Sequence, residues 1–127
     1  MIPISLRDSL AFVELTVTFR GNTLTLTDVL VDTGSGGTVL AIDMVRTIGL
    51  HEELTDTIRE LGGVGGVEYV VEKTVDSVTL DGVMISNFVL ELGGLDYGFV
   101  IDGIVGLDLL RATRATIDLD ALELSAK

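Results

Sequence analysis

The chain has 127 residues, 47% of them hydrophobic, with a mean hydropathy of +0.56. This length suits a single folded domain over residues 1–127, and the apolar content excludes an intrinsically disordered chain. A formal net charge of −12, from 20 acidic and 8 basic residues, argues against a nucleic-acid partner because such a surface repels phosphates. The absence of cysteine excludes disulfides and thiolate metal sites.

Neither a targeting segment nor a membrane span is evident in the sequence. The first residues include Pro3, Arg7 and Asp8, where a signal peptide would have a basic start and a long apolar run. No stretch approaches the roughly 18 apolar residues of a membrane span. We therefore expect a cytoplasmic protein without a membrane partner.

The first quarter of the chain predicts a β-hairpin. Residues 12–20 alternate between apolar and polar side chains, which places one apolar set on a common face: Val13, Leu15, Val17 and Phe19. After the turn residues Gly21 and Asn22, residues 23–31 resume the alternation and end in three consecutive apolar residues. Such a run is typical of a strand end that is buried on both faces.

The middle of the chain predicts strands around one short helix. Residues 38–41 favour a short strand, and apolar residues at helical spacing favour a helix over 42–48 that ends at Gly49. Two strand arms, 54–61 and 67–75, flank a glycine-rich tip and predict a mobile hairpin.

The last part of the chain again favours strands. A hairpin is predicted over 78–92, with Asp81 and Gly82 at its turn. Four shorter elements follow: a strand over 99–101, a helix over 107–111, and closing strands over 115–119 and 122–124. The whole pattern predicts a mostly β protein with one or two short helices.

Asp32 is the first candidate for chemistry. It follows the buried strand end and begins a loop of small residues, Asp32-Thr33-Gly34-Ser35. A carboxylate at such a place is costly unless it is hydrogen bonded, and the two hydroxyls and the backbone beside Gly34 could provide those bonds. The structural alternative is an Asx turn that only ends the strand.

Two further segments accompany this loop. Ile104 and Val105, followed by Gly106, precede the predicted second helix; their structural alternative is an ordinary strand-to-helix turn. The glycine-rich tip consists of Gly62, Gly63, Val64, Gly65 and Gly66. This tip lacks the Gly-Lys-Ser/Thr ending of a phosphate loop, and its alternative is a plain flexible loop.

Together these segments resemble the single-domain, retropepsin-like aspartic proteases, over roughly residues 10–125. The loop 32–35 is similar to the family's active-site motif, residues 104–106 to its hydrophobic-hydrophobic-glycine element, and residues 62–66 stand where it has a flap. The resemblance is closer to cellular and bacterial members than to viral ones. It implies a closed, retropepsin-like acid protease barrel with a flap hairpin, half of a pepsin-type bilobal architecture.

Two departures from the viral pattern occur together. Gly36 and Gly37 stand where viral enzymes often have acidic residues, and Leu107 stands where they often have arginine. In viral enzymes these residues form an ion pair, and the loss of both ends avoids an orphan charge.

The resemblance also implies the chemistry. Two aspartates of this family share one proton and activate a water. The chain holds one such motif, so the second aspartate would be Asp32 of a second copy across a two-fold axis. Thr33 would then bond across that axis and Ser35 would support the carboxylate, while residues 2–5 and 122–125 would help join the subunits. Asp102 lacks the following hydroxyl residues and is expected to be structural.

We therefore expect an aspartic endopeptidase that is active as a homodimer on extended peptides or proteins, without a metal or cofactor. Apolar walls from Val31, Val39, Ile104 or Val105 would favour hydrophobic residues at the cut. One alternative is a non-catalytic retropepsin-fold module for dimerisation or peptide binding, in which substitution of Asp32 has no effect. Another is a monomeric β domain without a groove, in which the motifs are coincidental.

Overall fold

The computed structural model describes residues 1–63, 66–95 and 98–127, with the side chains of 61–63 and 66–68 left out. The helical elements are α1 (Ile42–Val45), the 3-10 turn η1 (Arg46–Ile48) and α2 (Leu107–Ala112). The strands are β1 (Ile2–Pro3), β2 (Ser5–Arg7), β3 (Leu10–Phe19), β4 (Asn22–Val31), β5 (Val39–Ala41), β6 (Thr57–Gly63), β7 (Gly66–Leu80), β8 (Val83–Gly93), β9 (Gly103–Val105), β10 (Thr116–Asp118) and β11 (Glu123–Ser125). The mostly β class predicted from the sequence is confirmed.

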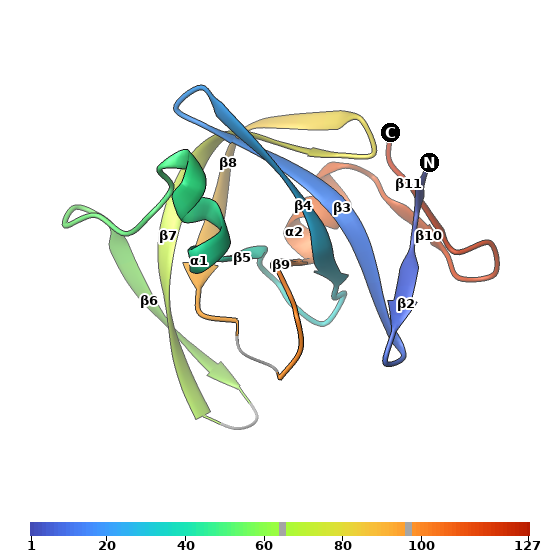
Figure 1. Ribbon diagram of the computed structural model, residues 1–127, viewed down its shortest axis with the longest axis horizontal. Helices are drawn as coiled ribbons and strands as arrows, with labels where there is room; N and C mark the ends of the chain where they lie inside the picture. The colour runs from blue at the N-terminus through green and yellow to red at the C-terminus, as the bar shows by residue number, and fades with distance from the viewer. Residues whose placement is uncertain (64–65, 96–97) are drawn as a thin grey trace.

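The described strands form two sheets (Figure 1). The larger has eight strands in the order β2-β3-β4-β9-β5-β8-β7-β6, and the smaller has three in the order β1-β11-β10. An additional pairing of β3 with β7 joins two distant strands of the larger sheet, so the strands from β3 round to β7 form a closed ring. The β6–β7 hairpin extends from this ring, on the side away from the chain termini (Figure 1).

The predicted hairpin of β3 and β4 is confirmed, but its turn lies one residue earlier than expected. Phe19 pairs with Asn22, so the two turn residues are Arg20 and Gly21. Both have positive φ angles, 48° and 82°, as the primed two-residue turns between antiparallel strands require. Asn22 is therefore the first residue of β4 rather than part of the turn.

The second hairpin and the short helix also follow the prediction. Leu80 pairs with Val83 around the turn of Asp81 and Gly82. The helical segment of α1 and η1 ends at Gly49, whose φ of +80° is the left-handed conformation that glycine adopts most easily.

The predicted strand over 99–101 is wrong. These residues have no regular structure, and the strand lies instead at β9. Local pattern alone could not place it, because β9 forms where it can pair with both β4 and β5.

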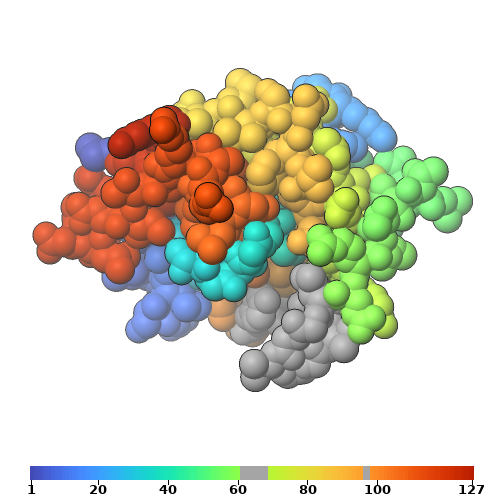
Figure 2. Space-filling model, turned by 180° about the vertical axis from the view of Figure 1, so that it is seen from behind, coloured from blue at the N-terminus to red at the C-terminus, as the bar shows by residue number. Residues whose placement is uncertain are grey.

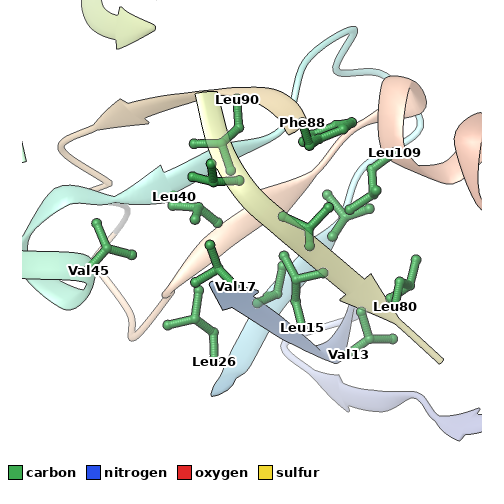
Figure 3. Close-up of a cluster of buried hydrophobic side chains, with 14 of the residues drawn as sticks. Val13, Leu15, Val17, Leu26, Leu40, Val45, Leu80, Phe88, Leu90 and Leu109 are labelled. Carbon is green, nitrogen blue, oxygen red and sulfur yellow. The ribbon is translucent and has the colours of Figure 1, made fainter. Parts of the chain in front are cut away.

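The core fills the ring of the larger sheet (Figure 3). The alternating apolar face predicted for β3 is confirmed, since its four residues are all at most 5% exposed: Val13, Leu15, Val17 and Phe19. Leu40, Leu90 and Leu109 come from three other elements and pack in the same cluster. Burial of this many apolar side chains is the main force that holds the ring together.

Both chain termini meet at the turn of the second hairpin. The terminal ammonium of Met1 lies 2.7 Å from a carboxylate oxygen of Asp81, and the N–H of Ala126 donates to the other oxygen. Strand β1 pairs with β11 in the same chain, with Ile2 opposite Leu124. The terminal strands expected to join two subunits thus pair with each other within one chain. No helix in the described ranges is long and apolar enough to cross a membrane.

Candidate active site

Strand β9 is held between β4 and β5. Residues 29–31 of β4 run parallel to β9, and residues 39–40 of β5 run antiparallel to it. The loop over residues 32–38 joins β4 to β5, so it must pass over the end of β9. A strand from late in the sequence therefore positions the loop that begins at Asp32.

Asp32 is held mainly by backbone groups. Its N–H donates to the carbonyl of Val105 at 3.0 Å, and its own carbonyl accepts from the N–H of Ser35 at 3.1 Å. The carboxylate oxygen Oδ1 accepts from the N–H of Gly34 at 2.9 Å. A side chain at Gly34 would bring its Cβ within 3.2 Å of that oxygen, so a small residue there leaves room for the carboxylate. Asp32 itself is partly buried.

The two hydroxyl residues of the loop have different surroundings. Thr33 is exposed and lines a hollow of about 390 Å³ with residues of α2 and the segment after it. The hydroxyl of Ser35 donates to the carbonyl of Gly37 at 2.7 Å; its expected support of the Asp32 carboxylate stays a prediction. Ser35 therefore shapes the loop through its hydroxyl and bonds to Asp32 through its backbone N–H.

Ile104, Val105 and Gly106 lie directly behind the loop. A Cβ on Gly106 would collide with the backbone carbonyl of Gly37 and lie 2.9 Å from the carbonyl oxygen of Ser35. The next N–H, that of Leu107, donates to the same Ser35 oxygen at 2.8 Å. This close approach needs glycine. Val105 is fully buried in the core, so it cannot form a wall of a substrate groove, whereas Ile104 is 7% exposed.

The loop is braced by two residues that the sequence analysis did not single out, Thr38 and Asp108. The fully buried Thr38 hydroxyl donates to Asp108 Oδ1 at 2.7 Å and accepts from the N–H of Gly106 at 3.1 Å. Asp108 Oδ2 accepts from the Thr38 N–H at 3.2 Å. An acidic residue in the first turn of a predicted helix was the available signal for Asp108, but nothing in the sequence paired it with Thr38.

Asp102 has the structural place that was expected of it. It is 4% exposed, and its Oδ2 accepts from the N–H of Asp28 at 3.1 Å. Its own backbone N–H donates to the carbonyl of Asp28 at 2.8 Å. The carboxylate is thus engaged inside the sheet.

The predicted flap residues lie at the end of the β6–β7 hairpin. Gly62 pairs with Val67 and Gly63 with Gly66, while Val64 and Gly65 lie outside the described residues. The arms of this hairpin reach the Asp32 loop, since Arg59 of β6 and Glu72 of β7 line a cavity of about 480 Å³ together with Ser35, Gly36, Gly37, Val39, Val89, Glu91 and Asp108. In Figure 2 the cyan segment that includes the loop lies at the surface, beside the orange segment that includes α2.

The carboxyl group of Glu91 in this cavity has a shifted pKa. Burial raises the pKa of the Glu91 carboxyl, and the carboxylates of Glu72 and Asp108 raise it further against the opposing effect of Arg59. Among the described side chains, no group of three or more His, Cys, Asp or Glu is arranged to hold a metal ion.

Comparison with known proteins gave a family and a fold. A model of the aspartyl protease family matches residues 15–109, which is most of the chain. A retropepsin-like aspartic protease from Rickettsia conorii superposes with a TM-score of 0.69 at 20% identity, over 98% of this chain and 97% of that one. The retroviral protease-like domain of Ddi1 from Leishmania major gives a TM-score of 0.63 at 21% identity, over 93% and 88%. A search of curated protein sequences found no match.

Proposed function

Because the chain belongs to the aspartyl protease family, we propose that it is an aspartic endopeptidase with Asp32 as its catalytic residue. The observation that carries this proposal is the setting of the Asp32 carboxylate. It directly follows the end of β4, accepts a backbone hydrogen bond from Gly34, and is only partly buried. The loop that carries it is braced by Gly106 and by the bonds of Thr38 with Asp108. Rigid backing of an accessible carboxylate favours a reactive group over a plain turn.

The reaction requires two such carboxylates. One takes a proton from water while the other, which is protonated, donates a hydrogen bond to the carbonyl oxygen of the scissile peptide. The oxygen of that water bonds to the carbonyl carbon to give a tetrahedral intermediate. The intermediate collapses as the C–N bond breaks and the carboxyl that took the water proton passes it to the leaving amine. Two carboxylates held so close cannot both ionise, so the pair shares one proton and titrates as a unit.

A second copy of the chain would supply the second carboxylate. Asp102 is buried and bonded to Asp28, so it cannot serve as the partner. A two-fold dimer would bring Asp32 of each chain together on its axis. The hollow beside Thr33 supports an interface there, because Leu107, which is 41% exposed, lines it with Leu110 and Ile117. In such a dimer Thr33 would bond across the axis.

The substrate would be an extended peptide held between the loop and the β6–β7 hairpin. An extended chain can pair its main-chain groups with the site and place alternate side chains in pockets. The hairpin, with glycines at 62, 63, 65 and 66, would act as a flap that opens for the peptide and closes over it.

The test is cleavage of a diverse peptide mixture from about pH 3 to pH 8, at several enzyme concentrations, with Asp32→Asn as the control. We expect cleavage by the wild type that is lost in the variant, and a specific activity that rises with concentration. Cleavage that persists in the variant would remove Asp32 from the chemistry. A folded dimer that cleaves nothing would point to the non-catalytic peptide-binding module.

A further inference from the structure

Glu91 is a buried acid without a full set of hydrogen bonds. The residue is 7% exposed, and its Oε2 atom is the buried side-chain oxygen that finds no hydrogen-bond partner among the described residues. A buried carboxylate normally has hydrogen bonds or a close cation, because leaving it without them is costly. A carboxylate in this state calls for a partner that the described residues do not supply.

The carboxylate lies against the active-site loop. A Cβ built on Gly37 would come within 2.5 Å of Glu91 Oε1, so the glycine makes room for the acid. The backbone N–H of Glu91 donates to the carbonyl of Thr38 at 3.0 Å, which fixes β8 beside the loop. Glu91 and Gly37 both line the cavity of about 480 Å³ that the hairpin arms cover. We call this cavity the Glu91 pocket.

The pocket is negatively charged. Arg59 is the basic residue among those that line it, against the three acids Glu72, Glu91 and Asp108. Its side chain is 53% exposed, and its guanidinium lies 3.5 Å from Glu72 and 4.0 Å from Glu91, so it is divided between them. Asp108 already accepts hydrogen bonds from Thr38 and from the N–H of Leu109. Glu91 is therefore the acid whose charge is least compensated.

Elsewhere in the chain, the charge of a buried cation is fully compensated by two carboxylates. The side chain of Lys73 is 6% exposed, and its ammonium lies 2.7 Å from Glu53 and 2.9 Å from Asp56. Those distances are hydrogen-bond distances, whereas the 4.0 Å between Arg59 and Glu91 is not. A cation is thus attracted to the place beside Glu91, and Arg59 does not occupy that place fully.

We propose that the Glu91 pocket binds the lysine or arginine side chain of a peptide substrate, at a position that flanks the scissile bond. The inference rests on the proposed peptidase function and adds a specificity to it. The cation of the peptide takes the place of Arg59 beside Glu91, and its aliphatic stem lies along Val39 and Val89. Arg59 moves into solvent, which its exposure on the β6 arm allows. The flanking position follows because residues 35–37 line the pocket and Asp32 does not.

The specificity has a pH dependence with a fixed sign. The groups that face Glu91 are Arg59 of β6, Glu72 of β7 and Asp108 of α2. Since the pKa of Glu91 is raised, its carboxyl gains a proton at a higher pH than an ordinary glutamate does. A protonated carboxyl no longer attracts a cation, so the preference for a basic side chain weakens as the pH falls.

The experiment compares eight-residue peptides in which lysine or norleucine is moved through each position. Cleavage by the wild type is measured as kcat/KM, and binding is measured to the Asp32→Asn protein, so that affinity is obtained without turnover. We expect lysine to be favoured about tenfold or more over norleucine at one position, and Glu91→Gln to reduce that ratio to about 1 to 2. Arg59→Gln should raise the ratio, because it removes the competing cation. Glu14→Gln removes one charge from an exposed site on β3 and should leave the ratio unchanged.

The outcomes separate this inference from the proposed function. Cleavage without a lysine preference, or a preference that survives Glu91→Gln, overturns the pocket and leaves the peptidase intact. Lysine-dependent binding that needs Glu91, without any cleavage, supports the pocket and overturns the peptidase. If Glu91→Gln fails to fold, Arg59→Gln decides the matter, since an unchanged or lower ratio in that variant also overturns the pocket.

Discussion

Asp32 and Asp102 stand beside the same pair of parallel strands and have opposite surroundings. Asp32 follows the last residue of β4 and remains partly open, with one carboxylate oxygen bonded to Gly34. Asp102 precedes the first residue of β9, is 4% exposed, and bonds through its carboxylate to Asp28. The position of an aspartate relative to its strand therefore decides how exposed its carboxylate is: Asp32 begins the loop after β4, whereas Asp102 ends the loop before β9.

A bulge in β4 causes the arrangement around Asp102. Val13 pairs with Val29 but Leu15 pairs with Leu26, so two steps on β3 match three on β4. The extra residue leaves the ladder locally irregular. Asp102 pairs with Asp28 in this irregular stretch through both its carboxylate and its backbone N–H. Asp102 is thus bonded to β4 at both its carboxylate and its backbone N–H, while the Asp32 carboxylate is bonded within its own loop.

The largest expected effect comes from placing the same substitution at both aspartates. Asp32→Asn should reduce peptide cleavage by roughly 10²–10⁴-fold, the usual contribution of acid–base catalysis, and change the free energy of unfolding by less than about 0.5 kcal/mol. Asp102→Asn should retain most of the cleavage rate per folded molecule. Cleavage kinetics and denaturant unfolding of both variants check these expectations. Equal losses of rate would contradict the distinction between the two residues.

The next effect concerns the glycine behind the Asp32 loop. Gly106→Ala should lower the free energy of unfolding by about 3 kcal/mol, because its Cβ would collide with the carbonyl of Gly37. Gly36→Ala is the matched control, since a Cβ there has nothing within 4 Å. Urea unfolding of the two variants gives the comparison. If the Gly106→Ala protein were as stable as the Gly36→Ala protein, the segment after β9 would not be in close contact with the loop.

A smaller loss is expected from truncating the buried aspartate. Asp102→Ala removes the acceptor for the N–H of Asp28 and leaves that partly buried donor beside the bulge without its partner. Stability should fall by about 2 kcal/mol, typical of a buried group left without its partner. Asp102→Asn keeps an oxygen at the site and serves as the control in the same unfolding experiment. If alanine and asparagine destabilise equally, the hydrogen bond to Asp28 contributes little.

The smallest effect is a pH dependence at the compensated charge cluster. The hydrogen bond from Lys73 lowers the pKa of Glu53. Burial raises the pKa of Asp56, but the hydrogen bonds from Lys73 and from the backbone of Glu53, with the charge of Lys73, together lower it. Carboxyl groups with lowered pKa values stabilise the fold above their ordinary pKa and lose that contribution as the pH falls through the folded value. The stability difference between wild type and Lys73→Met should therefore shrink as the pH falls below about 4. A difference that stays constant in acid would show that the cluster does not stabilise the fold through its charges.

Much of this arrangement could be predicted from local pattern. The alternating face of β3 and the turn of Asp81 and Gly82 are short-range features, and the structure has both. Asp32 was singled out because it follows three apolar residues and begins a loop, Asp32-Thr33-Gly34-Ser35, that resembles the active-site motif of aspartic proteases; its catalytic role stays a prediction. The position of β9 could not be found in this way, since its strand pairing depends on β4 and β5.

Glu91 shows most clearly what the local sequence pattern cannot predict. Its neighbours Leu90 and Leu92 are apolar and buried in the core, so alternation predicts that Glu91 faces solvent on the other side of β8. It is buried because the loop at Gly37 and the arms of the β6–β7 hairpin cover that side. Such covering joins distant segments and leaves no periodic signal in the sequence. The pairing of Thr38 with Asp108 is hidden for the same reason.

The central claim is that Asp32 of two chains together form one active site, and mixing tests it most directly. Wild-type chains are combined with increasing amounts of Asp32→Asn chains, allowed to exchange, and assayed for peptide cleavage at a constant total concentration. If each site needs two intact aspartates, activity should fall as the square of the wild-type fraction, because mixed dimers are inactive. Activity that falls in simple proportion to the wild-type fraction would show that each chain works alone.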